Sequence, residues 1–362
     1  MKPPRIANFL GHYPAPGGTT TAVGGLSRAI VRLGWDVIIY CCAKDGQSSA
    51  EYVAEDGIRV VRFGSRSRNP FHVDPKLLDR VSQNQDEIDL LIINGMFYPP
   101  SLALGSASRS AGIPYVVCPH GLYHPDLLKR SRWRKLPYGI FFERPFLNAA
   151  SAIQVFAQEH QELLVNYGVR RPVLVVPNGF DGHEVSEAPA PQISQQASYR
   201  FLYLGRLDSH SKGLDLLLRG FALGICGGKL PSTLRLDFIG ADGGDRHKLE
   251  SLADRLSITQ NVRFIGHVSD RSPAAIIGSY DLLVLPSRFD GFGLVVLEAM
   301  AAGKPVIVSE EAGISSYVKK AQCGYLVRPD SDSISLGLIR AFQTRDKWRS
   351  MGDKGKHFAH EH

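Results

Sequence analysis

The sequence predicts an α/β protein of two doubly wound, Rossmann-like domains with a cleft between them. Short apolar runs of strand type alternate with helical patterns from one end of the chain to the other. Such alternation implies parallel sheets that helices cover on both faces. The chain has 362 residues, which suggests two domains at roughly 100–200 residues each. A segment rich in Pro, Ala, Ser, Gln and Glu, without a periodic apolar pattern, separates the halves and has the composition of a linker.

Candidate strands follow one another along both halves. In the first half they are Arg5–Leu10, Val37–Cys41, Leu90–Ile93, Tyr115–Cys118 and Val173–Val176. In the second half they are Phe201–Leu204, Leu234–Ile239, Val262–Ile265, Leu282–Leu285 and Val306–Val308. Apolar residues from Leu214 to Phe221 recur at helical spacing and predict an amphipathic helix. We therefore expect domains at 1–180 and 199–362, joined by a linker at 181–198, with ligands at the carboxyl ends of the strands.

The bulk composition is that of an ordinary soluble protein. Hydrophobic residues make up 44% and charged residues 21% of the chain. Pro3 and Pro4 interrupt the start, and Ile6–Leu10 is too short for the apolar core of a signal peptide, so we expect a cytoplasmic protein. The five cysteines lack paired spacing, which favours buried free thiols over disulfides or a zinc site. The formal net charge of +7 suits a nucleotide diphosphate, an acidic membrane surface or a nucleic acid.

The most informative stretch runs from Pro286 to Pro305, at the end of a predicted strand. Gly291 and Gly293 predict a tight loop that lets backbone approach a ligand closely. Leu294–Ala302 is predicted to be a helix, with Gly303 as its C-terminal cap. The amide N–H groups at the start of this helix favour an anion in the loop.

Two carboxylates lie eight positions apart in this stretch, Asp290 before the predicted helix and Glu298 inside it. The helix rises about 7–8 Å from Gly293 to Glu298, so a diphosphate at the helix start would lie between the two acids. Glu298 can accept two hydrogen bonds, as the vicinal hydroxyls of a ribose require. The alternative is that Glu298 only pairs with a nearby lysine or arginine.

A second loop, from Gly205 to Leu214, follows the strand Phe201–Leu204 and carries two cations. Arg206 lies at the end of the strand, and Lys212 opens the amphipathic helix. Arginine offers a planar fork for phosphate and lysine a compact charge, so together they could neutralise a diphosphate and stabilise it as it leaves. Two solvated surface cations are the alternative.

These two loops resemble the signature of the family 4 glycosyltransferases, retaining enzymes of the GT-B fold. Their pattern is an acidic residue, seven others and then Glu, and it usually opens with Glu-Gly-Phe-Gly. This chain has Asp290 in place of the first Glu, which keeps the negative charge and shortens the reach of the side chain by one methylene. The resemblance implies donor contacts from Gly291, Phe292, Gly293, Leu294 and Glu298, and a diphosphate held by Arg206 and Lys212. It extends to Val176–Asp181, Leu236–Gly240 and Phe264–Val268. In the second of these segments, Gly240 would approach the nucleotide base.

Two features of the first half match the same family. Gly17 and Gly18 follow the first strand, where the family has a Gly-Gly loop beside the donor phosphates; the alternative is a simple turn. His120 follows the strand Tyr115–Cys118, and many family members place a His-Gly pair there with the histidine close to the donor sugar. A structural or surface histidine is the alternative.

The resemblance implies transfer of a sugar from a nucleotide-diphosphate donor to an acceptor hydroxyl by front-face attack, with no cofactor and no metal. The acceptor would be a sugar or a lipid-linked saccharide, in polysaccharide or glycolipid biosynthesis. Asp330 and Asp332 follow a strand that begins near Tyr325 and are interpreted as helix-capping residues rather than metal ligands. A nucleotide-sugar epimerase of the same fold and a non-catalytic nucleotide-sugar-binding protein remain the alternatives.

A basic run, Lys129–Lys135, contains five Lys and Arg residues around Trp133, with Tyr138, Ile140, Phe141 and Phe142 after it. Basic residues beside aromatic ones suit an anionic membrane surface, here the inner face of the membrane. The alternative is a solvated helix followed by core residues. No nucleic-acid-binding motif accompanies the charge, so nucleic acid is not expected.

Overall fold

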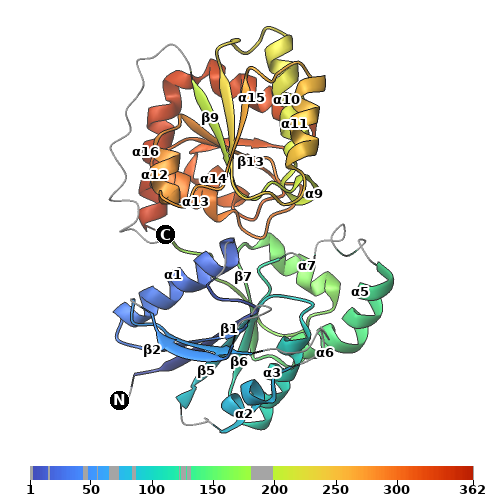
Figure 1. The fold of residues 1–362 in the computed structure, drawn as a ribbon, viewed down its shortest axis with the longest axis vertical. Helices are drawn as coiled ribbons and strands as arrows, with labels where there is room; N and C mark the ends of the chain where they lie inside the picture. The colour runs from blue at the N-terminus through green and yellow to red at the C-terminus, as the bar shows by residue number, and fades with distance from the viewer. Residues whose placement is uncertain are drawn as a thin grey trace. The chain divides into compact units, whose positions relative to one another are not determined.

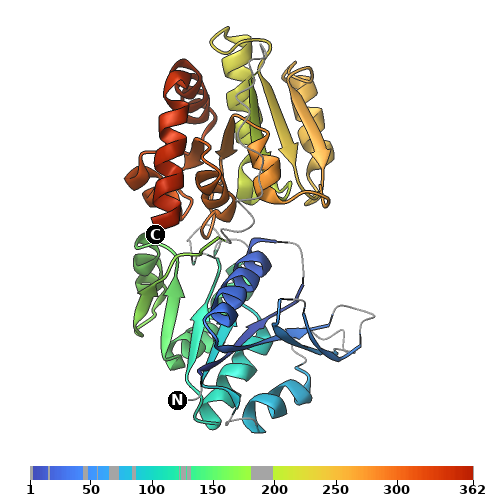
Figure 2. The same cartoon turned by 90° about the vertical axis from the view of Figure 1, so that its left-hand side faces the viewer.

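The computed structural model describes residues 3–14, 17–43, 48–54, 56–64, 73–83, 87–121, 123, 128, 132–180 and 199–361. The chain divides into two compact units, Met1–Gly179 and Phe180–His362. Each unit contains a single sheet between layers of helices (Figures 1 and 2). The linker expected at 181–198 lies outside the described residues.

The first unit is built on an eight-stranded sheet. In spatial order its strands are β3 (Ala50–Val53), β4 (Arg59–Phe63), β2 (Asp36–Cys42), β1 (Arg5–Leu10), β5 (Leu90–Asn94), β6 (Tyr115–Cys118), β7 (Ala152–Val155) and β8 (Val173–Val175). All neighbours pair in parallel except β3, which runs antiparallel to β4 at the edge. The strand order reverses direction between β1 and β5, as in a doubly wound fold.

Helices cover both faces of this sheet. They are α1 (Gly18–Arg32), α2 (Pro75–Gln83), α3 (Pro99–Ser110), α5 (Arg132–Tyr138), the π-helix η2 (Gly139–Glu143), α6 (Arg144–Ala149) and α7 (Glu159–Tyr167). Successive residues of β2 point to opposite faces: Tyr40 joins the apolar cluster of Leu77 and Leu104 from α2 and α3, and Cys41 joins that of Val23 from α1. The buried, apolar strand residues therefore place α1 on one face and α2 and α3 on the other.

The second unit has a six-stranded sheet in which all neighbours are parallel. In spatial order its strands are β11 (Val262–Gly266), β10 (Arg235–Ile239), β9 (Arg200–Leu204), β12 (Leu282–Leu285), β13 (Val306–Ser309) and β14 (Gly324–Val327). The order reverses direction between β9 and β12. Doubly wound sheets bind their ligands beside such a reversal, at the carboxyl ends of the strands.

The helices of the second unit again form two layers. They are α9 (Ser209–Lys212), α10 (Leu214–Cys226), α11 (Arg246–Arg255), α12 (Pro273–Gly278), α13 (Leu294–Ala301), α14 (Ser315–Ala321), α15 (Ser331–Gln343), the short η3 (Arg345–Lys347) and α16 (Trp348–Glu361). In Figure 1, α10 and α11 lie on one side of the sheet and α12, α13 and α16 on the other. Every residue of β12 is buried, as expected for a central strand covered on both faces.

All the strands that the sequence predicts are present, with ends shifted by no more than a residue. Three others were not predicted. β3 and β4 form the edge of the sheet, and β3 is largely exposed, so it lacks a clear apolar pattern. β7 begins at Ala152, only three residues after α6 ends at Ala149, so no long turn signal separates it from that helix.

Candidate active site

The predicted phosphate-binding loops of the second unit leave the two strands at which its sheet reverses. The first loop follows β9 and leads into α9, and the second follows β12 and leads into α13. The backbone N–H of Arg288 in the second loop donates to the carbonyl of Ser211 in the first, at 2.9 Å. The topology therefore brings together segments that lie about eighty positions apart in the sequence.

Lys212 and Asp290 form an ion pair between these loops. The Lys212 Nζ lies 2.5 Å from the Asp290 Oδ2, and their side chains are 24% and 13% exposed. The Oδ1 of Asp290 accepts the Phe292 N–H at 3.3 Å, and its backbone bridges to Ala312. The acid before α13 is therefore held firmly by its own loop and neutralised by a lysine from the other loop.

Arg206 stands at the carboxyl end of β9, where it was predicted. Its Nη2 donates to the Oδ2 of Asp208 at 3.1 Å, and the arginine side chain is 64% exposed. Asp208 caps α9 by accepting from the backbone N–H groups of His210 and Ser211. Burial would raise the pKa of the Asp208 carboxyl, but the hydrogen bonds from Ser211 and the charge of Arg206 outweigh it, and the pKa is lowered. Arg206 thus presents its charge to solvent at the carboxyl end of β9.

Glycines allow the strand ends to approach one another closely. A Cβ on Gly240 would lie 1.9 Å from the carbonyl oxygen of Gly205, so no side chain fits between the loops after β9 and β10. Gly293 precedes α13 with φ of 93°, in the left-handed region. Both glycines are therefore required by the backbone alone, whatever ligand binds beside them.

Helix α13 begins at Leu294, and its first turn has no acidic residue and no side-chain cap. Phe292, just before it, is buried against the ring of Tyr317, with ring centroids 5.9 Å apart. Gly291 and Glu298 are partly exposed, the former in the loop and the latter in the second turn of the helix. The start of α13 is therefore the kind of helix N-terminus that attracts an anion, with one carboxylate at the loop and another deeper along the helix.

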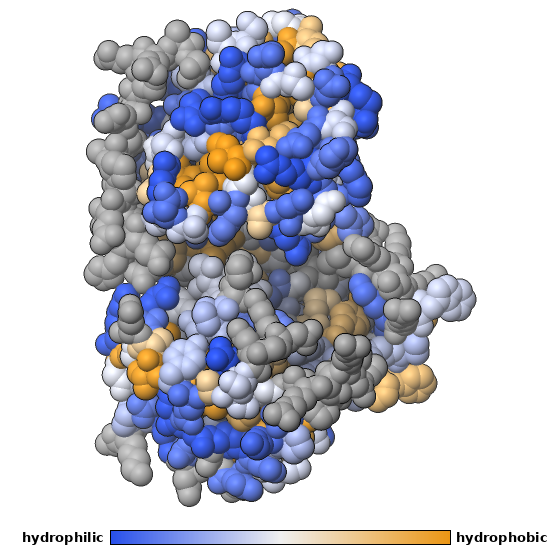
Figure 3. All heavy atoms as spheres, in the orientation of Figure 1, coloured by the Kyte–Doolittle hydropathy of each residue, from blue (hydrophilic) through white to orange (hydrophobic). Residues whose placement is uncertain are grey.

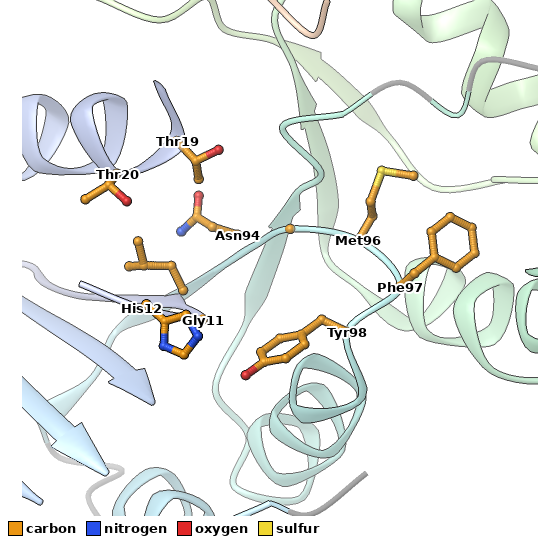
Figure 4. A pocket seen from close by; sticks show the side chains of 10 residues that line it. Gly11, His12, Thr19, Thr20, Asn94, Met96, Phe97 and Tyr98 are labelled. Carbon is orange, nitrogen blue, oxygen red and sulfur yellow. The ribbon is translucent and has the colours of Figure 1, made fainter. Parts of the chain in front are cut away.

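In the first unit, a pocket of about 420 Å³ lies at the reversal between β1 and β5. It is lined by Leu10, Gly11, His12, Thr19, Thr20, Asn94, Gly95, Met96, Phe97 and Tyr98. They come from the end of β1 and the loop after it, the start of α1, and the end of β5 and the loop after it (Figure 4). The pocket is therefore at the carboxyl edge of the sheet, where doubly wound folds bind their ligands.

His120 is held beside this pocket by Asn94. The His120 Nε2 lies 2.7 Å from the Asn94 Oδ1, while the Asn94 amide nitrogen donates to the carbonyl of Phe9 at 3.1 Å. The Asn94 oxygen must therefore accept, so the histidine donates from Nε2 and its Nδ1 can accept. Desolvation lowers the His120 pKa to about 4, which keeps the ring neutral. The residue also has φ of 53°, a costly conformation for a non-glycine residue.

Gly17 and Gly18 lie at the start of α1, after β1. Gly17 is the N-cap residue of the helix, with φ of 136°. Because glycine has no side chain, no side-chain hydrogen bond caps the helix. A Cβ added to either glycine would meet nothing within 4 Å. Packing within the first unit therefore does not explain the glycine at position 18.

Comparison with known proteins now adds independent evidence. A family model described as "Glycosyltransferase Family 4" matches residues 16–183, and one described as "Glycosyl transferases group 1" matches residues 186–358. Together they match almost the whole chain. The chain belongs to the family 4 glycosyltransferases.

Individual relatives agree with this assignment. Mannosylfructose-phosphate synthase of Agrobacterium fabrum is 25% identical over 95% of this chain and 82% of its own length. Phosphatidyl-myo-inositol mannosyltransferase of Mycobacterium leprae is 28% identical over 94% of this chain and 88% of its own. The crystal structure of HepE from Anabaena with UDP and glucose superposes with a TM-score of 0.76 at 20% identity, covering 99% of this chain and 95% of that one. The two sheets form the GT-B fold, and the protein is a glycosyltransferase with a nucleotide-sugar donor and a sugar or lipid acceptor.

Sequence reasoning missed three residues of this glycosyltransferase that organise its loops. Asn94 orients His120, and it could have been found as a polar residue at the end of a buried strand. Asp208 caps α9 between the two predicted cations. Arg288 makes two 2.8 Å hydrogen bonds to the Asp215 carboxylate and one of 2.6 Å to the Ser209 carbonyl, which ties the second loop to α9 and α10.

Other predictions meet different outcomes in the glycosyltransferase. Asp330 caps α15 through a 2.7 Å bond from the Ser333 N–H, which confirms the capping interpretation. No group of three or more potential metal ligands occurs among the described residues, and within that part of the chain no helix is long and apolar enough to cross a membrane. Lys129 and Arg130 lie outside the described residues. Ile140, Phe141 and Phe142 are exposed, so the alternative of core residues after the basic run is wrong.

Proposed function

We propose that this glycosyltransferase retains the anomeric configuration of the transferred sugar and needs no metal ion. The donor diphosphate binds to the second unit, at the start of α13, and the acceptor hydroxyl comes from the side of the first unit. The observation that carries the proposal is the Lys212–Asp290 pair, which joins a cation to the loop that leads into α13, a helix without a side-chain cap. The boundaries that we propose for the two domains are 1–180 and 199–362, with 181–198 as the linker.

In the donor site, the negative charge of the diphosphate meets two cations and the helix N-terminus. A lysine ammonium has three N–H donors, so Lys212 can remain on Asp290 and still donate to a phosphate oxygen. Arg206 offers its exposed fork to the second phosphate, while Glu298 accepts from the ribose hydroxyls. Charge grows on the diphosphate as the sugar leaves, so Arg206 and Lys212 stabilise the transition state more than the ground state. Asp290 acts by aiming Lys212.

Gly240 and the loop from Gly291 to Leu294 complete this site by letting backbone lie against the nucleotide. On the other side, Gly17 and Gly18 present the uncapped start of α1 to the donor phosphates. His120, neutral and fixed by Asn94, offers its Nδ1 to a hydroxyl of the donor sugar. The departing phosphate takes the proton of the acceptor hydroxyl, so the reaction needs neither a protein base nor a nucleophile.

The acceptor that we propose is a lipid-linked saccharide at the cytoplasmic face of a membrane. The support is the basic run Lys129–Lys135, since each cation near an anionic surface adds about 1 kcal/mol of attraction. Sedimentation with anionic and neutral vesicles tests it. Binding should favour the anionic vesicles and fall when the five cations are changed to Gln. Equal binding to both kinds of vesicle would make a soluble acceptor the better explanation.

One set of incubations tests the proposed reaction. The enzyme is first titrated with a panel of nucleoside-diphosphate sugars, and the donor that binds is then incubated with and without acceptors, in the presence and absence of a chelator. We expect transfer with retained configuration, unaffected by the chelator, and slow hydrolysis of donor alone. An epimerised donor would indicate an isomerase, and binding without turnover a non-catalytic protein. Inverted product or chelator-sensitive transfer would contradict the proposed mechanism.

A further inference from the structure

Five large apolar side chains stand at the surface of the first unit over α5 and η2, and we call them the apolar face. They are Trp133, Leu136, Ile140, Phe141 and Phe142, which are 93%, 48%, 43%, 70% and 55% exposed. In Figure 3, light orange spheres stand at the right-hand edge of this unit, where Figure 1 places α5. Large exposed apolar groups on one short segment mark an interaction site in a soluble domain.

The π-helix explains why these side chains face outward. Gly139 and Glu143 bound η2 and are both buried, so the three residues between them lie on the outside of the turn. The Glu143 Oε1 accepts from the Phe97 N–H at 3.0 Å and from the Tyr123 hydroxyl at 2.8 Å. A Cβ on Gly139 would lie 2.5 Å from the Tyr167 hydroxyl oxygen, so the segment packs tightly on its inner side. The apolar face is therefore presented by a well-anchored turn.

Charge decides which partner fits the apolar face. Five basic residues lie within Lys129–Lys135, and no Asp or Glu occurs from Leu127 to Phe142. A second copy of this chain, joined face to face by a two-fold axis, would bring the basic runs against each other. An anionic bilayer instead attracts the basic residues and accepts the aromatic and aliphatic side chains below its headgroups.

We propose that the apolar face inserts into the headgroup–acyl boundary of an anionic membrane. The basic run attracts the protein to the surface, and Trp133, Phe141 and Phe142 then enter the bilayer. Insertion gives the binding a component that salt does not remove, since apolar burial is not screened. The inference extends the proposed lipid-linked acceptor by naming the contact surface, but it does not depend on any residue of the donor site.

The experiment measures partitioning onto vesicles of phosphatidylcholine with phosphatidylglycerol, at low salt and at about 1 M salt, where the screening length is about 3 Å. The double variant Phe141→Ser, Phe142→Ser is compared with the control Leu33→Ser, Leu336→Ser, whose leucines are 70% and 68% exposed elsewhere. We expect the first to lower partitioning at least about ten-fold, because two aromatic side chains no longer leave water, and the control to leave it unchanged. Donor affinity should be unaltered in both, which shows that they fold.

Trp133 provides a second readout, because it is the most exposed tryptophan of the three in the chain. Its emission should shift to the blue on vesicles and be quenched by brominated acyl chains, and Trp133→Phe should remove both signals. Unchanged emission, equal losses in the two double variants, or complete release at high salt would overturn insertion. So would a dimer that Phe141→Ser, Phe142→Ser dissociates, since the apolar face would then serve a second copy. Donor binding in all these variants separates failure of the membrane contact from failure of the proposed function.

Discussion

Changing Arg206 to Ala should remove activity while leaving the fold nearly intact. The arginine side chain is 64% exposed, and its one described ion pair is to Asp208. Exposed pairs of this kind are worth about 0–1 kcal/mol. Substitutions at exposed positions usually change the free energy of unfolding by about 0.5 kcal/mol or less, and we expect a change of that size here. For domains of this size, that corresponds to a change in Tm of about 1–2 °C.

The expected loss of activity is much larger. Arg206 is proposed to meet charge that develops on the diphosphate, and removal of one such group typically costs about 2.7–4 kcal/mol, or 10²–10³ in kcat. Lys212→Ala should behave differently. It leaves the Asp290 carboxylate, 13% exposed, without its cation, so it should lower both stability and activity. The contrast between the two variants separates an electrostatic role from a structural one.

Arg328→Ala provides the matched control for this prediction. Arg328 lies in the same unit, is 73% exposed and pairs with Asp330 at 3.5 Å. The Arg328→Ala substitution therefore removes the same charge and a similar ion pair, at a position far in sequence from the loop after β9. Rates of nucleotide release with acceptor give kcat/KM, and thermal unfolding gives Tm, for both variants. If Arg206→Ala retains the activity of Arg328→Ala, or if its loss of activity follows its loss of Tm, Arg206 is only a surface cation.

Three other predictions concern single positions. Glu298→Gln should weaken donor binding by about 1.5–3 kcal/mol and preserve the fold. Calorimetric titration measures the binding, with Glu310→Gln as the control variant. Full activity of Glu298→Gln would remove the ribose contact from the proposal. Gly18→Ala should raise or keep the Tm, since the new Cβ meets nothing within 4 Å and alanine favours the helix by about 0.5–1 kcal/mol. The same variant should raise the KM for the donor, whereas the control Gly25→Ala, also in α1, should leave the KM unchanged. Equal kinetics in the two variants would mean that Gly18 only forms a turn. Burial lowers the pKa of His120 and of His160 to about 4, below the roughly 6.5 of an unfolded histidine. The unfolded chain therefore binds more protons than the folded chain between these pH values, and the free energy of unfolding of the first unit should fall as pH decreases from about 6.5 to 4. Urea titrations at several pH values give the slope of that free energy against pH, which should be smaller for His160→Gln. An unchanged slope would contradict the lowered pKa.

Much of the fold could be predicted from the sequence because its signals are local. Apolar strands between helical patterns mark parallel sheets, and the glycines around Asp290 and before Lys212 mark loops that enter helices. The edge strand β3 escaped prediction because an exposed strand has no buried face to produce alternation. For Phe141 and Phe142 the sequence left a membrane-facing surface and the core as alternatives, because an apolar side chain in a sequence does not reveal whether it faces the core or water.

By itself, the sequence determined that this is a two-unit α/β glycosyltransferase, and it predicted a donor site in the loops after its strands. Only the tertiary structure decided which of these loops meet. Lys212 pairs with Asp290 across 78 positions because their loops leave the strands at the reversal between β9 and β12. His120 pairs with Asn94 across 26 positions because β5 and β6 are neighbours in the sheet. The physical reason is that a strand–loop–helix motif is specified by neighbours in sequence, whereas a contact between two loops is specified by the order in which strands pair and by the glycines that let their ends approach.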